Sequence, residues 1–255
     1  MLARAVVLPG TPLLVPGAGG GTDLLGDVRR VADAALDRLI ADLGDLVAAD
    51  PEPAPVPALD PRAGAPLMVL APVPRRATAG LGVRRPSLAG VGVADRWVPA
   101  VAGWPDRDVP AAHAPASVAL VALAGALDRA GRAGHADRAD RSGRPRAHRP
   151  PVAVLEVSGE VPAPHVAALR GARAVVVAGG VAPGTPGAAA AAKAGAPGDG
   201  GGRPAGDPGL DPAVAAALDL AAAPGRWTWT VTTVPGGHEH LPAVYRVAEG
   251  VAGRG

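Results

Sequence analysis

The sequence has no cysteine and no phenylalanine, and Tyr245 and Lys193 are its only tyrosine and its only lysine. The absence of cysteine excludes disulfides, thiolate metal ligands and a cysteine nucleophile. Because aromatic side chains are scarce, the core must consist of alanine, valine and leucine. Such a core buries little apolar area per residue.

Long hydrophobic runs are also missing. Pro9, Pro12 and Pro16 interrupt the first apolar stretch, and no other stretch approaches the length of a membrane span. The N-terminus carries one arginine, Arg4, and no cleavage pattern of a signal peptide, so we expect a cytoplasmic protein without a membrane partner. The net charge of +2 gives no strong field toward nucleic acid.

Glycine and proline are abundant, with 36 and 30 residues, but 48% of the chain is apolar, which argues against global disorder. We interpret residues 1–255 as one domain with two disordered insertions. Residues 132–150 form an Arg-rich linker without aromatic residues for base stacking, so no nucleic acid is expected there. Residues 179–209 are low in complexity and show no apolar periodicity.

Apolar runs alternate with amphipathic segments, which predicts an α/β fold with a mostly parallel central sheet flanked by helices. The expected strands are 3–8, 45–50, 66–71, the end of 80–93, 152–158, 173–180 and 226–234, with 243–250 as a pairing partner. The expected helices begin after Thr22-Asp23 and cover 25–43, 117–130, 162–171 and 211–222.

The stretch "VVLPGTPLLVPGAGGG" is the first candidate site. It makes a sharp turn after the first strand, where α/β folds place their clefts, so we expect Pro9, Gly10, Thr11 and Pro12 to line one. The glycines from Gly17 to Gly21 could form a nucleotide-binding loop. Prolines separate them from the strand and no Walker lysine follows, which favours a plain turn.

The second candidate is "GGHEHLP", the only cluster of histidines. In an extended segment His238 and His240 point to the same side. With Glu249, the carboxylate nearest in sequence, they could bind iron or zinc, and Glu156 is another possible third ligand. The alternative interpretation is a polar turn after a strand, without any cofactor.

Four segments together resemble one family: "VVLPGTPLLVPGAGG", the helix "DVRRVADAALDRLIADLGDLV", "RRPSLAGVGV" and "ASVALVALAGALDRAG". Their order is similar to that of actinobacterial proteins with a class III extradiol dioxygenase-like domain. The similarity covers about the first 130 residues. The resemblance implies an α/β fold with non-haem iron held by two histidines and a carboxylate.

This sequence departs from the family at the metal ligands. Gly10 stands where the resemblance places the first iron-binding histidine, and "AADPEPAP" offers no histidine where the second is expected. We therefore expect a protein without ring-cleavage activity that binds a small molecule or a protein partner. The alternatives are a divergent metal-dependent oxidoreductase or hydrolase using His238 and His240, and a nucleotide-binding protein. The pattern leaves open whether the chain forms a homo-oligomer.

Overall fold

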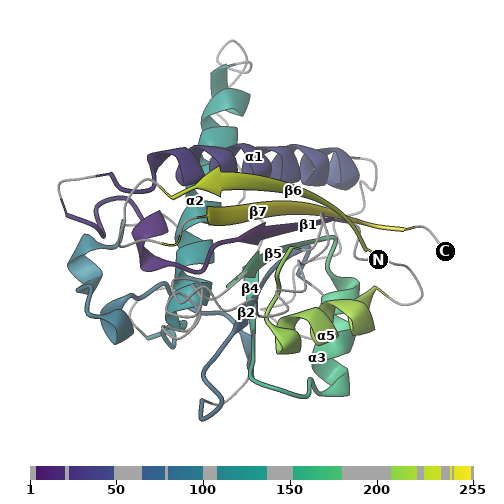
Figure 1. Ribbon diagram of the computed structural model, residues 1–255. Helices are drawn as coiled ribbons and strands as arrows, with labels where there is room; N and C mark the ends of the chain where they lie inside the picture. Colours follow the sequence, from purple (N-terminus) through teal and green to yellow (C-terminus); the bar gives the residue numbers. More distant parts are fainter. Residues whose placement is uncertain are drawn as a thin grey trace, which may run out of the picture.

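The computed structural model describes residues 4–20, 23–48, 65–77, 80–99, 108–136, 152–179, 208–222, 227–236, 242 and 244–253. These residues form a mixed α/β structure with one seven-stranded sheet, whose strand order is β3-β4-β2-β5-β1-β7-β6 (Figure 1). The strands are β1 (Arg4–Leu8), β2 (Leu67–Pro72), β3 (Gly80–Gly82), β4 (Val152–Val157), β5 (Ala174–Ala178), β6 (Trp227–Pro235) and β7 (Val244–Ala252).

The centre of the sheet is parallel and its margins are antiparallel. Strands β4, β2, β5 and β1 run in one direction, while β3 at one margin and β7 at the other oppose their neighbours. Strand β6 is antiparallel to β7. The expected sheet is therefore confirmed as α/β with a parallel centre, but half of its strand pairings are antiparallel.

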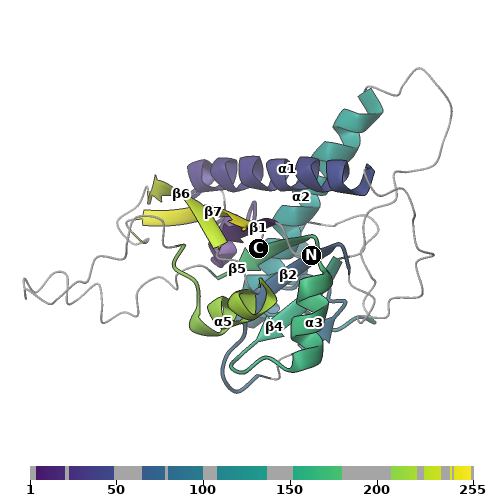
Figure 2. The same ribbon diagram turned by 90° about the vertical axis from the view of Figure 1, so that its right-hand side faces the viewer.

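Helices cover both faces of the sheet. Helices α1 (Gly26–Ala48) and α2 (Ala114–Ala136) lie on one face, and α3 (Ala163–Gly171) and α5 (Pro212–Ala221) lie on the other (Figures 1 and 2). Strand β1 alternates between the two cores: Val6 and Leu8 pack with α1 and α2, and Ala5 and Val7 pack on the opposite side. The period of two along a strand explains this division.

Two expected boundaries were wrong near the first two helices. Residues 45–48, expected within a strand, continue α1, because their Leu, Val and Ala residues extend the same helix without a break. Helix α2 exceeds the expected 117–130 at both ends and runs to Ala136, into the expected Arg-rich linker. The remainder of that linker, 137–151, lies outside the described residues.

The segment 80–93 also differs from expectation. Its strand, β3, comes at the start rather than at the end. Short 3-10 helices follow at Ala89–Val91 and Asp95–Trp97, and another, η1 (Pro12–Leu14), follows β1. Residues 180–207, most of the expected low-complexity insertion, lie outside the described residues.

The second half of the chain follows the sequence patterns closely. The segments β4, α3 and β5 form the expected strand-helix-strand unit, and β2 lies between its two strands. Asp211 caps α5, accepting a 2.9 Å hydrogen bond from the backbone N–H of Ala213. The expected pairing of β6 with 243–250 is also confirmed. None of the helices in the described part of the chain has the length and apolar character of a membrane span.

Candidate functional site

The carboxyl edge of the parallel strands is closed by tight backbone packing. A Cβ on Gly10, just after β1, would lie 2.8 Å from the Cα of Gly179, just after β5. Gly179 has a φ of +86°, and a Cβ there would lie 2.8 Å from the Pro72 side chain at the end of β2. Such contacts leave no room for a side chain at position 10 or 179. The position where the resemblance places an iron ligand is therefore one that only glycine fits.

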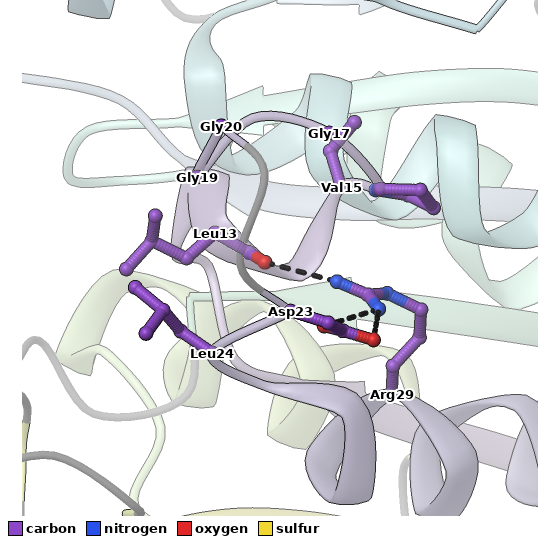
Figure 3. Close-up of a pocket in the computed structure, with 9 residues that line it drawn as sticks. Leu13, Val15, Gly17, Gly19, Gly20, Asp23, Leu24 and Arg29 are labelled. Carbon is purple, nitrogen blue, oxygen red and sulfur yellow. Dashed lines mark hydrogen bonds and ion pairs between the residues drawn. The ribbon is translucent and has the colours of Figure 1, made fainter.

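The loop after η1 is held in place by one arginine of α1. The Arg29 guanidinium donates hydrogen bonds to the backbone carbonyls of Leu13 and Leu14 at 3.2 and 2.9 Å. It also donates to both carboxylate oxygens of Asp23 at 2.7 and 2.8 Å (Figure 3). Arg29 therefore ties the loop to the start of α1.

This clamp bears on the nucleotide-binding alternative. The glycine loop borders a small cavity that Gly17, Gly19 and Gly20 share with Asp23 and Arg29. Asp23 neutralises the only described cation in that cavity, so an anionic phosphate would face a carboxylate. Asp23 was expected to cap α1, yet the carbonyl of Leu25 accepts the first helical hydrogen bond. The geometry gives nucleotide binding no support, and Thr22 and Gly21 lie outside the described residues.

A second cavity is a groove between α1 and α2, with a volume of about 170 Å³. Its walls are mostly short apolar side chains, and charged side chains stand at its rim. The lining comprises Leu14, Val15, Pro16, Ala32, Pro99, Val118, Val121, Ala122, Ala124 and Gly125, with Arg29, Asp33, Asp128 and Arg129. The alanines and the glycine leave the space between the helices open. Neither cavity is lined by Pro9, Gly10, Thr11 or Pro12.

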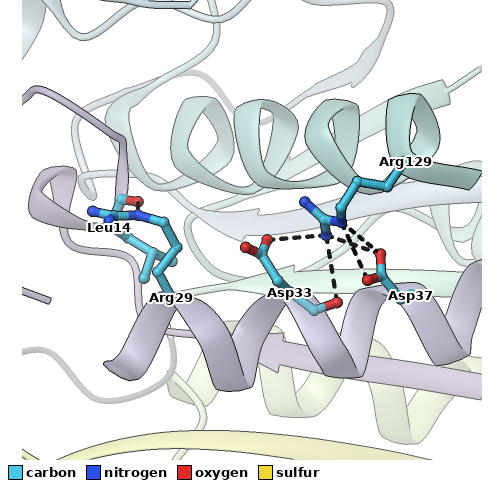
Figure 4. Close-up of polar contacts among 5 residues, drawn as sticks. All are labelled: Leu14, Arg29, Asp33, Asp37 and Arg129. Carbon is cyan, nitrogen blue, oxygen red and sulfur yellow. Dashed lines mark hydrogen bonds and ion pairs between the residues drawn. The ribbon is translucent and has the colours of Figure 1, made fainter. Parts of the chain in front are cut away.

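One arginine of α2 bridges two aspartates of α1 at the rim of this groove. Arg129 donates to Asp37 at 2.9 and 3.0 Å and to the carboxylate of Asp33 at 3.1 Å (Figure 4). Burial raises the pKa of Asp33, and the attraction of Arg129 offsets part of this rise. The groove thus combines an apolar wall with a partly desolvated carboxylate.

A buried carboxylate occupies the end of β4. Glu156 is 2% exposed and accepts a 2.7 Å hydrogen bond from the backbone N–H of His113, the residue before α2. The His113 ring nitrogen Nδ1 lies 3.1 Å from the same oxygen, and Arg84 lies 3.6 Å from the other. No third metal-ligating side chain joins this pair among the described residues. The arrangement anchors the N-terminus of α2 to the sheet.

The predicted metal ligands are only partly covered. Glu249, on β7, forms a bidentate ion pair with Arg38 of α1, with N–O distances of 2.7 and 2.9 Å. His238 and His240 lie outside the described residues, so the metal site with iron or zinc stays a prediction. To serve as a ligand, Glu249 would have to leave Arg38.

Sequence reasoning did not find the groove or its charged rim. Arg29, Asp33 and Asp37 were interpreted only as the polar side of an amphipathic helix. The α1–α2 contact could not be derived from either helix alone, because it depends on how the two helices pack on the sheet. The chain has no significant match among protein-family models, curated proteins or solved structures. Its function is therefore inferred from the geometry of the described residues.

Proposed function

We propose that this chain is a small-molecule binding protein with a fold like that of the class III extradiol dioxygenases and without ring-cleavage activity. The observation that carries the proposal is the groove between α1 and α2, where short side chains leave about 170 Å³ beside a partly buried carboxylate. Binding pockets typically combine mostly apolar walls with a few polar groups that orient the ligand.

The closed strand edge supports the absence of ring cleavage. A histidine at position 10 would overlap the backbone of Gly179, and backbone cannot move aside as the end of a flexible side chain can. Glycine itself supplies no ligand atom, so the first position of a two-histidine, one-carboxylate site is lost.

Size and polarity define the ligand class. An engineered apolar cavity of about 150 Å³ binds benzene, so a groove of this volume matches a single ring. The Asp33 carboxylate accepts hydrogen bonds, and in partly desolvated surroundings an unmatched donor-acceptor pair is costly. The ligand is therefore a one-ring apolar compound that carries a hydroxyl or amino donor.

Titration with phenol and toluene, followed by ligand-observed NMR, tests the binding proposal. Phenol is expected to bind more tightly than toluene to the wild-type protein. Ala122→Leu fills the groove and should weaken phenol binding at least tenfold. Ala167→Leu makes the same change at an exposed position of α3 on the opposite face and should leave binding unchanged. Equal phenol binding by both variants would exclude the groove as the site.

The absence of ring cleavage is tested separately. The purified protein is loaded with Fe(II) and incubated with catechol under air, and absorbance is followed for a ring-opened product. We expect no product and no stoichiometric retention of iron after desalting. Retained iron together with ring opening would overturn this part of the proposal and favour the metalloenzyme that uses His238 and His240.

A further inference from the structure

The terminal strand β6 offers an unprotected sheet edge. It is nine residues long and pairs with β7 along its whole length. It is last in the strand order, and none of the described residues pairs with its outer side. In an antiparallel strand alternate N–H and C=O groups point away from the neighbour, so this outer side presents unused hydrogen-bonding groups.

The opposite edge of the same sheet shows the contrast. Strand β3 has only three residues, two of them glycines, and the Arg84 guanidinium lies near them. Short edge strands and nearby charges are common means of preventing edge-to-edge pairing. Strand β6 has neither device: "WTWTVTTVP" contains no charged residue, and its one proline is the last residue.

Bulky side chains do not cover the outer edge of β6. The Trp229 ring lies across Gly250 on the neighbouring strand β7, so close that a Cβ on Gly250 would overlap the ring. The Trp227 ring stacks on Trp229, with 5.3 Å between the ring centroids, and its Nε1 lies 3.5 Å from the carbonyl of Leu218. Both rings therefore lean inward, toward β7 and α5.

The sequence of β6 is complementary to itself in one antiparallel register. Thr228, Thr230 and Thr232 are exposed on one face of the strand. If two copies pair about a two-fold axis at Thr230, Thr228 lies opposite Thr232 of the second copy and Thr230 lies opposite itself. Cross-strand threonine pairs are favourable, and an uncharged strand brings no like charges together.

From these observations we propose that the protein forms a homodimer through antiparallel pairing of β6 with β6 of a second copy. The two sheets then form one continuous sheet through the dimer axis. Such a contact is isologous, because the same strand is used on both sides, and it closes without further assembly. Two β6 edges are removed at once, which distinguishes this partner from an unrelated peptide strand.

The dimer is tested by analytical ultracentrifugation over a range of protein concentrations. Wild-type protein is expected to sediment as a dimer. Thr230→Lys places two like charges opposite each other at the axis and should weaken dimerisation at least tenfold. Ala41→Lys adds the same charge at an exposed position of α1 and should leave the dimer unchanged. A monomeric wild type, or an unaffected Thr230→Lys dimer, would overturn the proposal.

Disulfide crosslinking tests the register and does not depend on how well the lysine variant folds. The chain has no cysteine, so each introduced thiol is unique. Directly opposed residues bring their Cβ atoms to about 4.5–5.5 Å, close to the distance of a disulfide. Under mild oxidation Thr230→Cys should form a covalent dimer, whereas Thr228→Cys should not. Equal crosslinking of both variants, or of neither, would contradict the proposed pairing.

Discussion

The carboxylate of Glu156 accepts a hydrogen bond from the backbone N–H of His113, with a distance of 2.7 Å, and so joins the end of β4 to the start of α2. A buried carboxylate needs partners, because its transfer from water is otherwise costly. Here the partners are the backbone and ring of His113 and, at 3.6 Å, Arg84. The contact fixes where α2 begins and thereby one wall of the groove.

Removal of this carboxylate should destabilise the fold. Glu156→Ala leaves the N–H of His113 without its acceptor, and we expect a loss of about 1–3 kcal/mol in the free energy of unfolding. His113→Ala keeps the backbone hydrogen bond and removes a ring that is 39% exposed, so its effect should be smaller. Urea denaturation of both variants measures the difference. An equal loss in both would show that the ring contact matters as much as the helix anchor.

The glycines at the strand edge should not tolerate alanine. Gly179→Ala requires a left-handed backbone and also meets Pro72, so we expect a loss of at least about 1–2 kcal/mol. Gly44→Ala is the matched control, since a Cβ at this position of α1 meets no atom within 4 Å. The control should gain about 0.5–1 kcal/mol, because alanine favours the helix. Thermal unfolding distinguishes the two signs.

The pH dependence of Asp95 should change with its hydroxyl partner. The Ser87 hydroxyl donates to Asp95 at 2.7 Å and, with Arg85, holds the pKa of that carboxyl below its usual value. A lowered pKa stabilises the folded state above about pH 4, and this stabilisation is lost as pH falls through the folded-state value. Ser87→Ala should raise the pKa of Asp95, as measured by NMR titration of its carboxyl carbon. An unchanged titration would show that Arg85 alone is sufficient.

Asp33 should show the opposite sign. Burial raises its pKa, so the ionised form is disfavoured in the folded state, and stability decreases as pH rises from about 4 through the folded-state pKa. Asp33→Asn removes this slope and keeps an acceptor for Arg129. Compared with wild type, the variant should therefore gain stability as pH rises over that interval, as measured by urea denaturation. Asp27→Asn, at an exposed position of the same helix, controls for the change in net charge.

Patterns confined to one segment were predicted well. The apolar runs that became β1, β2, β4 and β5 are short and continuous, as buried strands are. The alternation in β6 also predicted its half-exposed faces. The boundary near residue 45 was wrong, because a short run of Leu, Val and Ala fits a strand and the end of a helix equally well.

The sequence by itself determined the α/β class, the composition of the core and the loss of a ligand atom at position 10, since each depends on local residue type and periodicity. Tertiary structure alone decided that Gly10 packs on Gly179, that Arg29 clamps the loop after η1, and that Arg129 meets Asp33 beside a groove. These contacts join segments far apart in the chain. Their distances depend on how helices and strands pack together, and no pattern within a single segment encodes that arrangement.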